Sequence, residues 1–217
     1  MVILGLTGSI GMGKTTTARM LRRLGVPVHD SDAAVHRLLA AGGAAVPAVE
    51  AAFPGTVRDG AVDRAALGAI VFADPAALAR LEALLHPLVT AGALDFLRHC
   101  ARRRCPVAVL DIPLLYETGA ERRCDRVLVV SAPALIQRQR VLRRPGMTPA
   151  KFAAILARQT PDAEKRRRAD WLIPSGLGRG PALRALARAI RLERSAPAGR
   201  WPPNALHWRR GGRRRHA

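Results

Sequence analysis

The residues best suited to chemistry lie near the start of the chain, in residues 8–15. Gly8 and Gly13 stand in the spacing G-x-x-x-x-G-K-T, which Lys14 and Thr15 complete. This is the pattern of a phosphate-binding loop. Glycines let backbone N–H groups turn toward phosphate oxygens, and the N-terminus of the following helix adds a favourable potential for the anion. A glycine-rich turn before a helix is the structural alternative, and the Lys-Thr pair counts against it.

The loop pattern also gives its parts chemical roles. Lys14 would reach the β- and γ-phosphates of a bound nucleotide, and the Thr15 hydroxyl would complete the shell of a Mg²⁺ ion. The apolar run before the loop predicts a buried strand, and residues 16–24 predict a helix ended by Gly25. We expect the nucleotide to be bound by these residues of the loop: Gly8, Gly11, Met12, Gly13, Lys14, Thr15 and Thr16.

A pair of carboxylates follows the second predicted strand, residues 26–29. Asp30 and Asp32 would stand at the carboxyl edge of a parallel sheet, where ligands bind in open α/β folds. Asp32 is therefore a candidate general base for a substrate hydroxyl. Alternatively, Asp and Ser at this point cap the helix that follows. Position alone does not decide between the two.

A third buried strand, residues 106–110, ends in Asp111. This carboxylate could lie near the magnesium, or it could hold the loop through backbone hydrogen bonds. Tyr116 and Glu117 follow at the same edge. Further strands are predicted over residues 126–130 and 169–173, and a closing helix over residues 183–192.

Two arginines, Arg140 and Arg144, follow the strand over residues 126–130. Four residues apart, they would share one face of a helix. Such a face suits a lid, residues about 137–165, that closes over transferring phosphates. The alternative is a solvated basic face, which an Arg-rich chain often has. Residues 165–168 read as a solvated helix end.

The composition fits one domain, or a core with a small inserted subdomain. At 217 residues the chain can bury about 70 % of its unfolded surface. Its formal net charge of +20 favours an anionic partner, but the excess is almost all Arg, which indicates a compositional bias. Six of the arginines lie in a tail over residues 195–217, which has no acid and no periodicity, so we expect disorder there.

Three cysteines match no metal spacing, and their odd number argues against a disulfide framework. No stretch approaches the ~18 apolar residues of a membrane span, and the apolar N-terminus lacks a basic leader region. We expect a cytoplasmic protein.

Between the strands, residues about 35–97 are mostly helical, with predicted helix starts at Asp63 and at Asp74-Pro75. This segment is too long for a simple crossover, so it predicts a substrate-binding lobe. His86, beside Pro87, reads as a structural residue more readily than as a site residue.

Taken together, these motifs resemble the dephospho-coenzyme A kinase family over about residues 2–190. The resemblance rests on the phosphate loop, the Asp30-Ser31-Asp32 and Leu85-His86-Pro87-Leu88 elements, and the motifs further along: residues 111–119, Gln137-x-x-Arg140-x-x-x-Arg144, Arg158-Gln159 and Ala169-Asp170. The loop alone names only a superfamily. The His-Pro and Pro-Leu-Leu-Tyr-Glu elements are far more specific.

The resemblance implies an α/β, three-layer P-loop kinase fold with a five-stranded parallel sheet, a helical lobe and a lid, over residues 1–194. It implies transfer of the ATP γ-phosphoryl group to the ribose 3′-hydroxyl of dephospho-coenzyme A, with Mg²⁺. Asp32 would accept the hydroxyl proton, and Arg140 and Arg144 would clamp phosphates. The acceptor's side of the cleft would be formed by His86, Leu114, Tyr116 and Glu117.

The sequence departs from the family in two places. The family often has Asn near the adenine after the last strand, where this chain has Ser175, and the tail has no counterpart. Two other functions stay open: another small-molecule kinase on the same core, and a nucleic-acid-binding NTPase suggested by the charge. The second lacks an aromatic platform for stacking bases. The oligomeric state, monomer or weak homo-oligomer, stays open.

Overall fold

The structure, a computed structural model, describes residues 1–196, 199, 201 and 202. The chain divides into two compact units. The first consists of Met1–His29 and the chain from His99 onward, and the second is Asp30–Arg98. The predicted disorder of the tail falls almost entirely on residues outside the described part.

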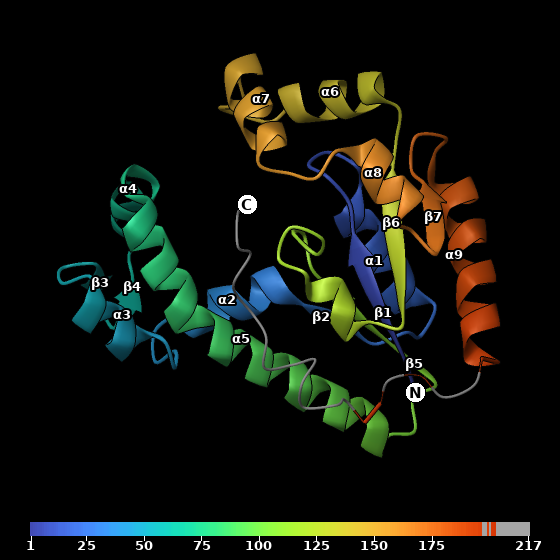
Figure 1. The fold of residues 1–217 in the computed structure, drawn as a ribbon, viewed down its shortest axis with the longest axis horizontal. Helices are drawn as coiled ribbons and strands as arrows, with labels where there is room; N and C mark the ends of the chain where they lie inside the picture. The colour runs from blue at the N-terminus through green and yellow to red at the C-terminus, as the bar shows by residue number, and fades with distance from the viewer. Residues whose placement is uncertain (197–198, 200, 203–217) are drawn as a thin grey trace, which may run out of the picture. The chain divides into compact units, whose positions relative to one another are not determined.

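A five-stranded parallel sheet is the centre of the first unit (Figure 1). Its order is β2-β5-β1-β6-β7, and β1 pairs in parallel with both β5 and β6. The phosphate loop therefore leaves the middle strand of the sheet. The strands are β1 (Val2–Thr7), β2 (Val28–Asp30), β5 (Val107–Asp111), β6 (Arg126–Ser131) and β7 (Trp171–Pro174). The predicted parallel sheet is confirmed.

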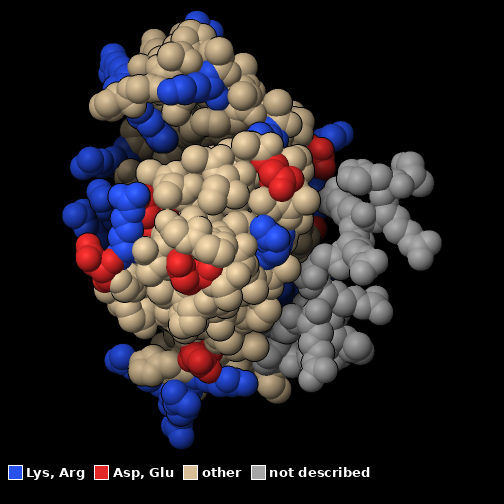
Figure 2. All heavy atoms as spheres, turned by 90° about the vertical axis from the view of Figure 1, so that its left-hand side faces the viewer, with Lys and Arg blue, Asp and Glu red and all other residues tan. Residues whose placement is uncertain are grey.

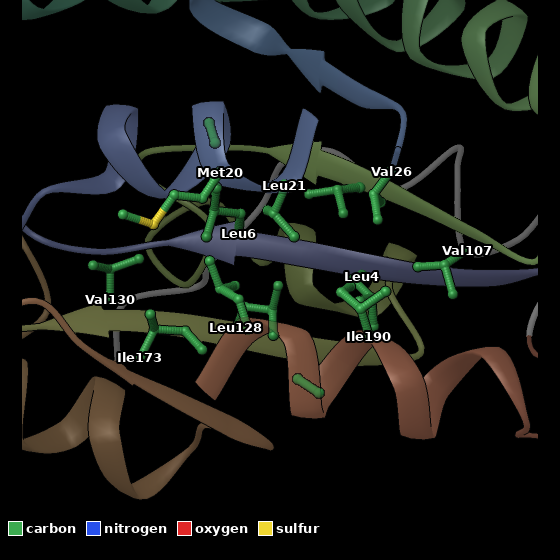
Figure 3. Packing of buried hydrophobic residues seen from close by; sticks show 14 of the residues in the cluster. Leu4, Leu6, Met20, Leu21, Val26, Val107, Leu128, Val130, Ile173 and Ile190 are labelled. Carbon is green, nitrogen blue, oxygen red and sulfur yellow. The ribbon is translucent and has the colours of Figure 1, made fainter. Parts of the chain in front are cut away.

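Helices α1 (Lys14–Arg23) and α9 (Arg179–Arg194) pack on one face of this sheet. Because side chains alternate along a strand, every second residue of β1 faces these helices. Leu4 and Leu6 of β1 meet Leu21 of α1 and Ile190 of α9 in one buried cluster (Figure 3). Aliphatic side chains dominate this core, as the few aromatic residues of the chain require.

The other face of β1 is covered by the segment that follows β5. A Cβ on Gly5 would lie 2.9 Å from the Cys124 sulfur and 3.1 Å from Leu115, so a larger residue there would displace these side chains. A short 3₁₀ helix, η1 (Ala120–Arg123), belongs to this segment. Between β6 and β7 lie α6 (Ala134–Leu142), α7 (Pro149–Ala157) and α8 (Asp162–Arg167).

The second unit is mostly helical and has its own apolar core. It contains α2 (Ser31–Leu39), α3 (Val46–Ala52), α4 (Arg64–Ala73) and most of α5 (Pro75–Arg102). Asp63 caps α4 through the N–H groups of Ala65 and Ala66, which confirms the predicted helix start. A small hairpin of β3 (Val57–Arg58) and β4 (Ala61–Val62) was not predicted.

Helix α5 is long and apolar enough to cross a membrane by length and composition alone. The prediction that no stretch reaches this limit is therefore wrong. Length and composition do not distinguish a membrane span from a long helix of a soluble enzyme. Helix α5 contributes Ala77 and Leu81 to the core of the second unit, and it contains Pro87, which cannot donate a helix hydrogen bond.

All three cysteines lie in the described part of the chain, and none of them forms a disulfide. On the face drawn in Figure 2, Lys and Arg side chains are widely spread and Asp and Glu are sparser, in line with the net charge of +20.

Candidate active site

The phosphate loop is shaped by its glycines. Gly11 and Gly13 have φ angles of 78° and 89°, which L residues with a side chain rarely adopt. Gly8 has a different reason to be glycine, because a Cβ there would lie 2.7 Å from the Val130 carbonyl oxygen. Gly13 is the N-cap of α1, and neither a capping side chain nor an acidic residue occupies the first turn. The helix thus begins with N–H groups directed at a site suited to an anion.

Lys14, the first residue of α1, forms an ion pair with Asp111 at the end of β5. The Nζ–Oδ1 distance is 2.7 Å, and the Asp111 side chain is only 2 % exposed. The strands β1 and β5 are neighbours, and their register sets Asp111 opposite Leu6, just before the loop. The structure gives Asp111 a role beyond the two predicted ones, because it is the carboxylate partner of the loop lysine.

Thr15 and Thr16 are exposed in the first turn of α1. Neither hydroxyl donates a hydrogen bond to a side chain or carbonyl of the described residues, whereas the buried Thr17 hydroxyl donates to Gly13 O at 3.3 Å. The two exposed threonines are therefore accessible to a ligand at the helix N-terminus.

Two glutamines hold Ile10, at the tip of the loop. The Gln137 amide nitrogen, from α6, donates to Ile10 O at 2.8 Å. The Gln159 side-chain oxygen, just after α7, accepts from Ile10 N at 3.0 Å. Both backbone polar groups of Ile10 are thus bonded to side chains more than 120 residues away in the sequence. The bonds from these glutamines to the loop were not predicted from the sequence, because nothing in their local pattern indicates a partner so far away.

Arg140 of α6 also lies against the loop. Its Nη2 donates to Ser175 O at 2.7 Å, its Nη1 donates to Ser175 Oγ at 3.1 Å, and Gly11 O is 3.5 Å from Nη1. The Ser175 hydroxyl donates in turn to Met12 O at 2.6 Å. Arg140 therefore lies beside the loop where the sequence predicted a phosphate clamp.

Arg144 is placed differently from the prediction. Helix α6 ends at Leu142 with Arg143 as its C-cap, so Arg144 lies beyond the helix and is exposed. The predicted shared helix face of Arg140 and Arg144 is wrong. Pro145 and Gly146 follow directly, and neither continues a helix well.

Tyr116 is part of the core of the first unit. Its side chain is 2 % exposed, its hydroxyl donates to Arg168 O at 2.9 Å, and the Arg168 guanidinium lies 4.0 Å from the ring centroid. Burial raises the pKa of the Tyr116 hydroxyl to about 12. This corrects the prediction that Tyr116 binds the acceptor, because its polar atom is already engaged inside the protein.

Glu117 is also engaged within the first unit. Its Oε1 lies 2.9 Å from Nζ of Lys165, which is fully buried, and accepts from Thr160 N at 2.8 Å. Burial would raise the pKa of Glu117, but the Lys165 hydrogen bond and the Thr160 N–H outweigh it and lower that pKa. Glu117 therefore anchors α8 and the end of α7, which corrects its predicted place in the acceptor site. Lys165, expected in a solvated helix end, is its buried partner.

Leu114, by contrast, is 41 % exposed, so it can contact a ligand. Its role in acceptor binding stays a prediction.

In the second unit, Asp30 is the N-cap of α2 and accepts from Ala33 N at 2.9 Å. The capping function is thus filled by Asp30, and Asp32, in the first turn, is exposed. The cap alternative for Asp32 is therefore removed. His86 is exposed on α5 and bonds to no described residue, so it is not the satisfied structural histidine that its apolar surroundings suggested.

Comparison with known proteins gives a consistent result. The family model for dephospho-CoA kinase matches residues 2–176. A dephospho-CoA kinase of Rhodospirillum rubrum is 60 % identical over 98 % of this chain and 97 % of its own length. One from Paramagnetospirillum magneticum is 68 % identical over 76 % of this chain and 78 % of its own.

Solved structures agree in fold. A Thermus thermophilus protein is 36 % identical with a TM-score of 0.78, covering 88 % of this chain and 97 % of its own. The dephospho-CoA kinase of Campylobacter jejuni has a TM-score of 0.62 at 22 % identity, covering 88 % and 96 %. The family match spans the phosphate loop, Asp111, Arg140 and Ser175, the residues that meet in the first unit. The chain belongs to the dephospho-CoA kinase family.

Proposed function

We propose that this dephospho-CoA kinase binds the phosphates of ATP in the loop at residues 8–15 and transfers the γ-phosphoryl group to the ribose 3′-hydroxyl of dephospho-coenzyme A. The observation that carries the proposal is the phosphate loop itself, with positive φ at Gly11 and Gly13 and an uncapped α1, in a chain of this family. Phosphoryl transfer needs alignment and charge neutralisation more than covalent chemistry by the protein.

The donor side is formed by the loop and α6. The loop amides and Lys14 would hold the phosphates, and Thr16 would add a donor at the start of α1. Arg140, already beside Gly11 and Ser175, would balance negative charge as it develops. Arg144, exposed beyond α6, would reach the nucleotide only from the segment after that helix.

Mg²⁺ would bind at the Thr15 hydroxyl, with Asp111 as a further carboxylate near the loop. Both groups offer oxygen atoms, which Mg²⁺ prefers, so the residues present fit the ion. Among the described residues no three His, Cys, Asp or Glu side chains cluster to hold a metal. Magnesium in kinases is bound largely by substrate phosphates and water, and when bound it neutralises phosphate charge.

The acceptor side would depend on Asp32. An exposed carboxylate in the first turn of α2, not used as the cap, is available to orient the 3′-hydroxyl and accept its proton. His86 and Leu114 would contact the acceptor, since both present exposed side chains. Tyr116 and Glu117 would not contact the acceptor, because their polar atoms are already bonded to other residues of the first unit.

The test is an assay with ATP and three separate acceptors: dephospho-coenzyme A, AMP and shikimate. We expect 3′-phosphorylated product only from dephospho-coenzyme A, with ADP formed in equal amount. Faster phosphorylation of AMP or shikimate would contradict the proposal. ATP hydrolysis stimulated by DNA or RNA, with binding that weakens steeply as salt rises, would favour the nucleic-acid alternative instead.

We propose a cytoplasmic enzyme that needs no nucleic acid or membrane for turnover. None of the three cysteines is in a disulfide, which suits a reducing compartment. Turnover that is independent of added vesicles and polynucleotide would support this.

A further inference from the structure

Ser175 occupies a junction of three elements in the first unit. It follows β7 directly, and its N–H donates to Ser131 O, at the end of β6, at 2.8 Å. Its hydroxyl donates to Met12 O of the phosphate loop and accepts from Arg140 of α6. Its carbonyl accepts from the second guanidinium nitrogen. One residue thus connects the sheet, the loop and the arginine.

The Ser175 hydroxyl acts as both a donor and an acceptor in this arrangement. A serine hydroxyl has one proton to donate and two lone pairs to accept with. The proton goes to Met12 O at 2.6 Å, and a lone pair accepts from Arg140 Nη1 at 3.1 Å. An alanine would keep the carbonyl contact to Nη2 and lose the other two.

The acceptors around Arg140 are all neutral: a hydroxyl and two backbone carbonyls. Among the described residues no carboxylate lies within ion-pair distance of its guanidinium. Lys14 differs, because Asp111 offsets its charge at 2.7 Å. The Arg140 group is therefore fixed in direction while its positive charge stays unbalanced beside the loop. Neutral acceptors orient a cation without cancelling the field that it exerts on a phosphate.

We propose that Ser175 is a positioning residue for phosphoryl transfer, which fixes the Arg140 guanidinium against the phosphate loop before the nucleotide binds. This rests on the proposed role of Arg140 at the transferring phosphates. Hydrogen bonds to charged groups are the stronger class, and preorganised charge acts mainly in the transition state. The loss of the hydroxyl should therefore lower kcat more than it raises KM.

The experiment is a double-mutant cycle on the full chain, with Ser175→Ala, Arg140→Ala and the double variant, each assayed for kcat, for KM of ATP and for thermal midpoint. We expect Ser175→Ala to lose roughly 10- to 100-fold in kcat. Arg140→Ala should lose more, and Ser175→Ala should cost much less in the Arg140→Ala background, where only its hydrogen bond to Met12 O is left to lose. Ser175→Thr keeps a hydroxyl and should recover most of the rate. Ser195→Ala, an exposed serine after α9, is the matched control.

Equal losses from Ser175→Ala in both backgrounds would overturn the inference, because Ser175 would then act independently of Arg140. Normal kcat for Ser175→Ala with an impaired Arg140→Ala would overturn it too, while leaving the role of Arg140 intact. Normal turnover of Arg140→Ala would remove Arg140 from the mechanism and the inference with it. If Ser175→Ala unfolds, Ser175→Thr decides: a folded Thr variant as slow as Arg140→Ala would contradict the proposal.

Discussion

Lys14 Nζ and Asp111 Oδ1 form a 2.7 Å ion pair between the start of α1 and the end of β5. The lysine is 17 % exposed and the aspartate 2 %, so the carboxylate is the buried member. The residue expected to meet the nucleotide is thus held by a partner on the neighbouring strand. A change at Lys14 will affect both binding and stability, and the two must be separated.

Lys14→Met should abolish activity and weaken ATP binding, and it should also cost about 3–5 kcal/mol of unfolding free energy, because it leaves the buried Asp111 charge without its ion pair. In the double variant Lys14→Met with Asp111→Asn, stability should return while activity stays lost. Isothermal titration and chemical denaturation measure the two effects. Lys151→Met, an exposed lysine on α7, is the control, and an equally inactive control would show that the assay reports only general damage.

Asp32→Asn should keep ATP binding and lose roughly 10²- to 10⁴-fold in kcat, the usual contribution of a general base. Asp30→Asn is a matched control, because Asn caps a helix as well as Asp does. It should preserve α2 and most of the activity. Turnover of Asp32→Asn within a few-fold of the original would exclude Asp32 as the base.

Tyr116→Phe should leave kcat and both KM values nearly unchanged and cost about 1 kcal/mol of stability, since it removes one hydrogen bond to Arg168 O. A large rise in KM for dephospho-coenzyme A would instead restore Tyr116 to the acceptor site.

The pKa of Tyr116 offers an independent check, because it is the only tyrosine in the chain. In the folded protein its pKa is about 12, against an ordinary value of 10.0. Between these values the unfolded chain has released the proton and the folded chain has kept it. Stability should therefore fall as pH rises from 10 toward 12. Tyrosinate absorbance followed in native and in denatured protein gives both midpoints.

Glu117→Gln should destabilise the first unit by about 3–5 kcal/mol at neutral pH, since it leaves the buried Lys165 ammonium without its counter-charge. The folded-state pKa of Glu117 lies below the ordinary 4.5, so this stabilisation is present above pH 4.5 and is lost as pH falls through the folded value. The difference between wild type and variant should shrink over that acidic range.

Denaturation curves at neutral and acidic pH measure the Glu117 effect. The exposed pair Arg98–Asp95 supplies the control, and Asp95→Asn should cost less than about 1 kcal/mol. A Glu117→Gln loss of the same small size would mean that the Lys165 pair contributes little.

The sequence predicted the elements with strong local signals. The continuous apolar run at residues 106–110 predicted a buried strand, which is β5 in the structure, and Asp63 and Asp74 each precede a helix that they cap. The two-residue strands β3 and β4 are too short for alternation to be visible. The strand order likewise depends on long-range packing that no local pattern contains.

The site was predictable where a motif is local and not where partners are distant. The phosphate loop is contained in eight consecutive residues. The burial of Tyr116 and the burial of Lys165 within a basic run depend on partners some 50 positions away, Arg168 and Glu117. The hydrogen bonds of Ser175 span 35 and 163 positions, so its role could be found only in three dimensions.

Gln137 and Gln159 hold the tip of the phosphate loop at Ile10, so the shape of the loop depends on residues far beyond the motif. The eight residues of the loop are complete by Thr15, yet the side chains that fix the direction of its tip are synthesised more than 120 residues later. A nascent or truncated chain that ends before residue 159 contains the whole motif and lacks one of its two supports. The geometry of the loop tip is therefore completed only when Gln137 and Gln159, far along the chain, have packed against its beginning.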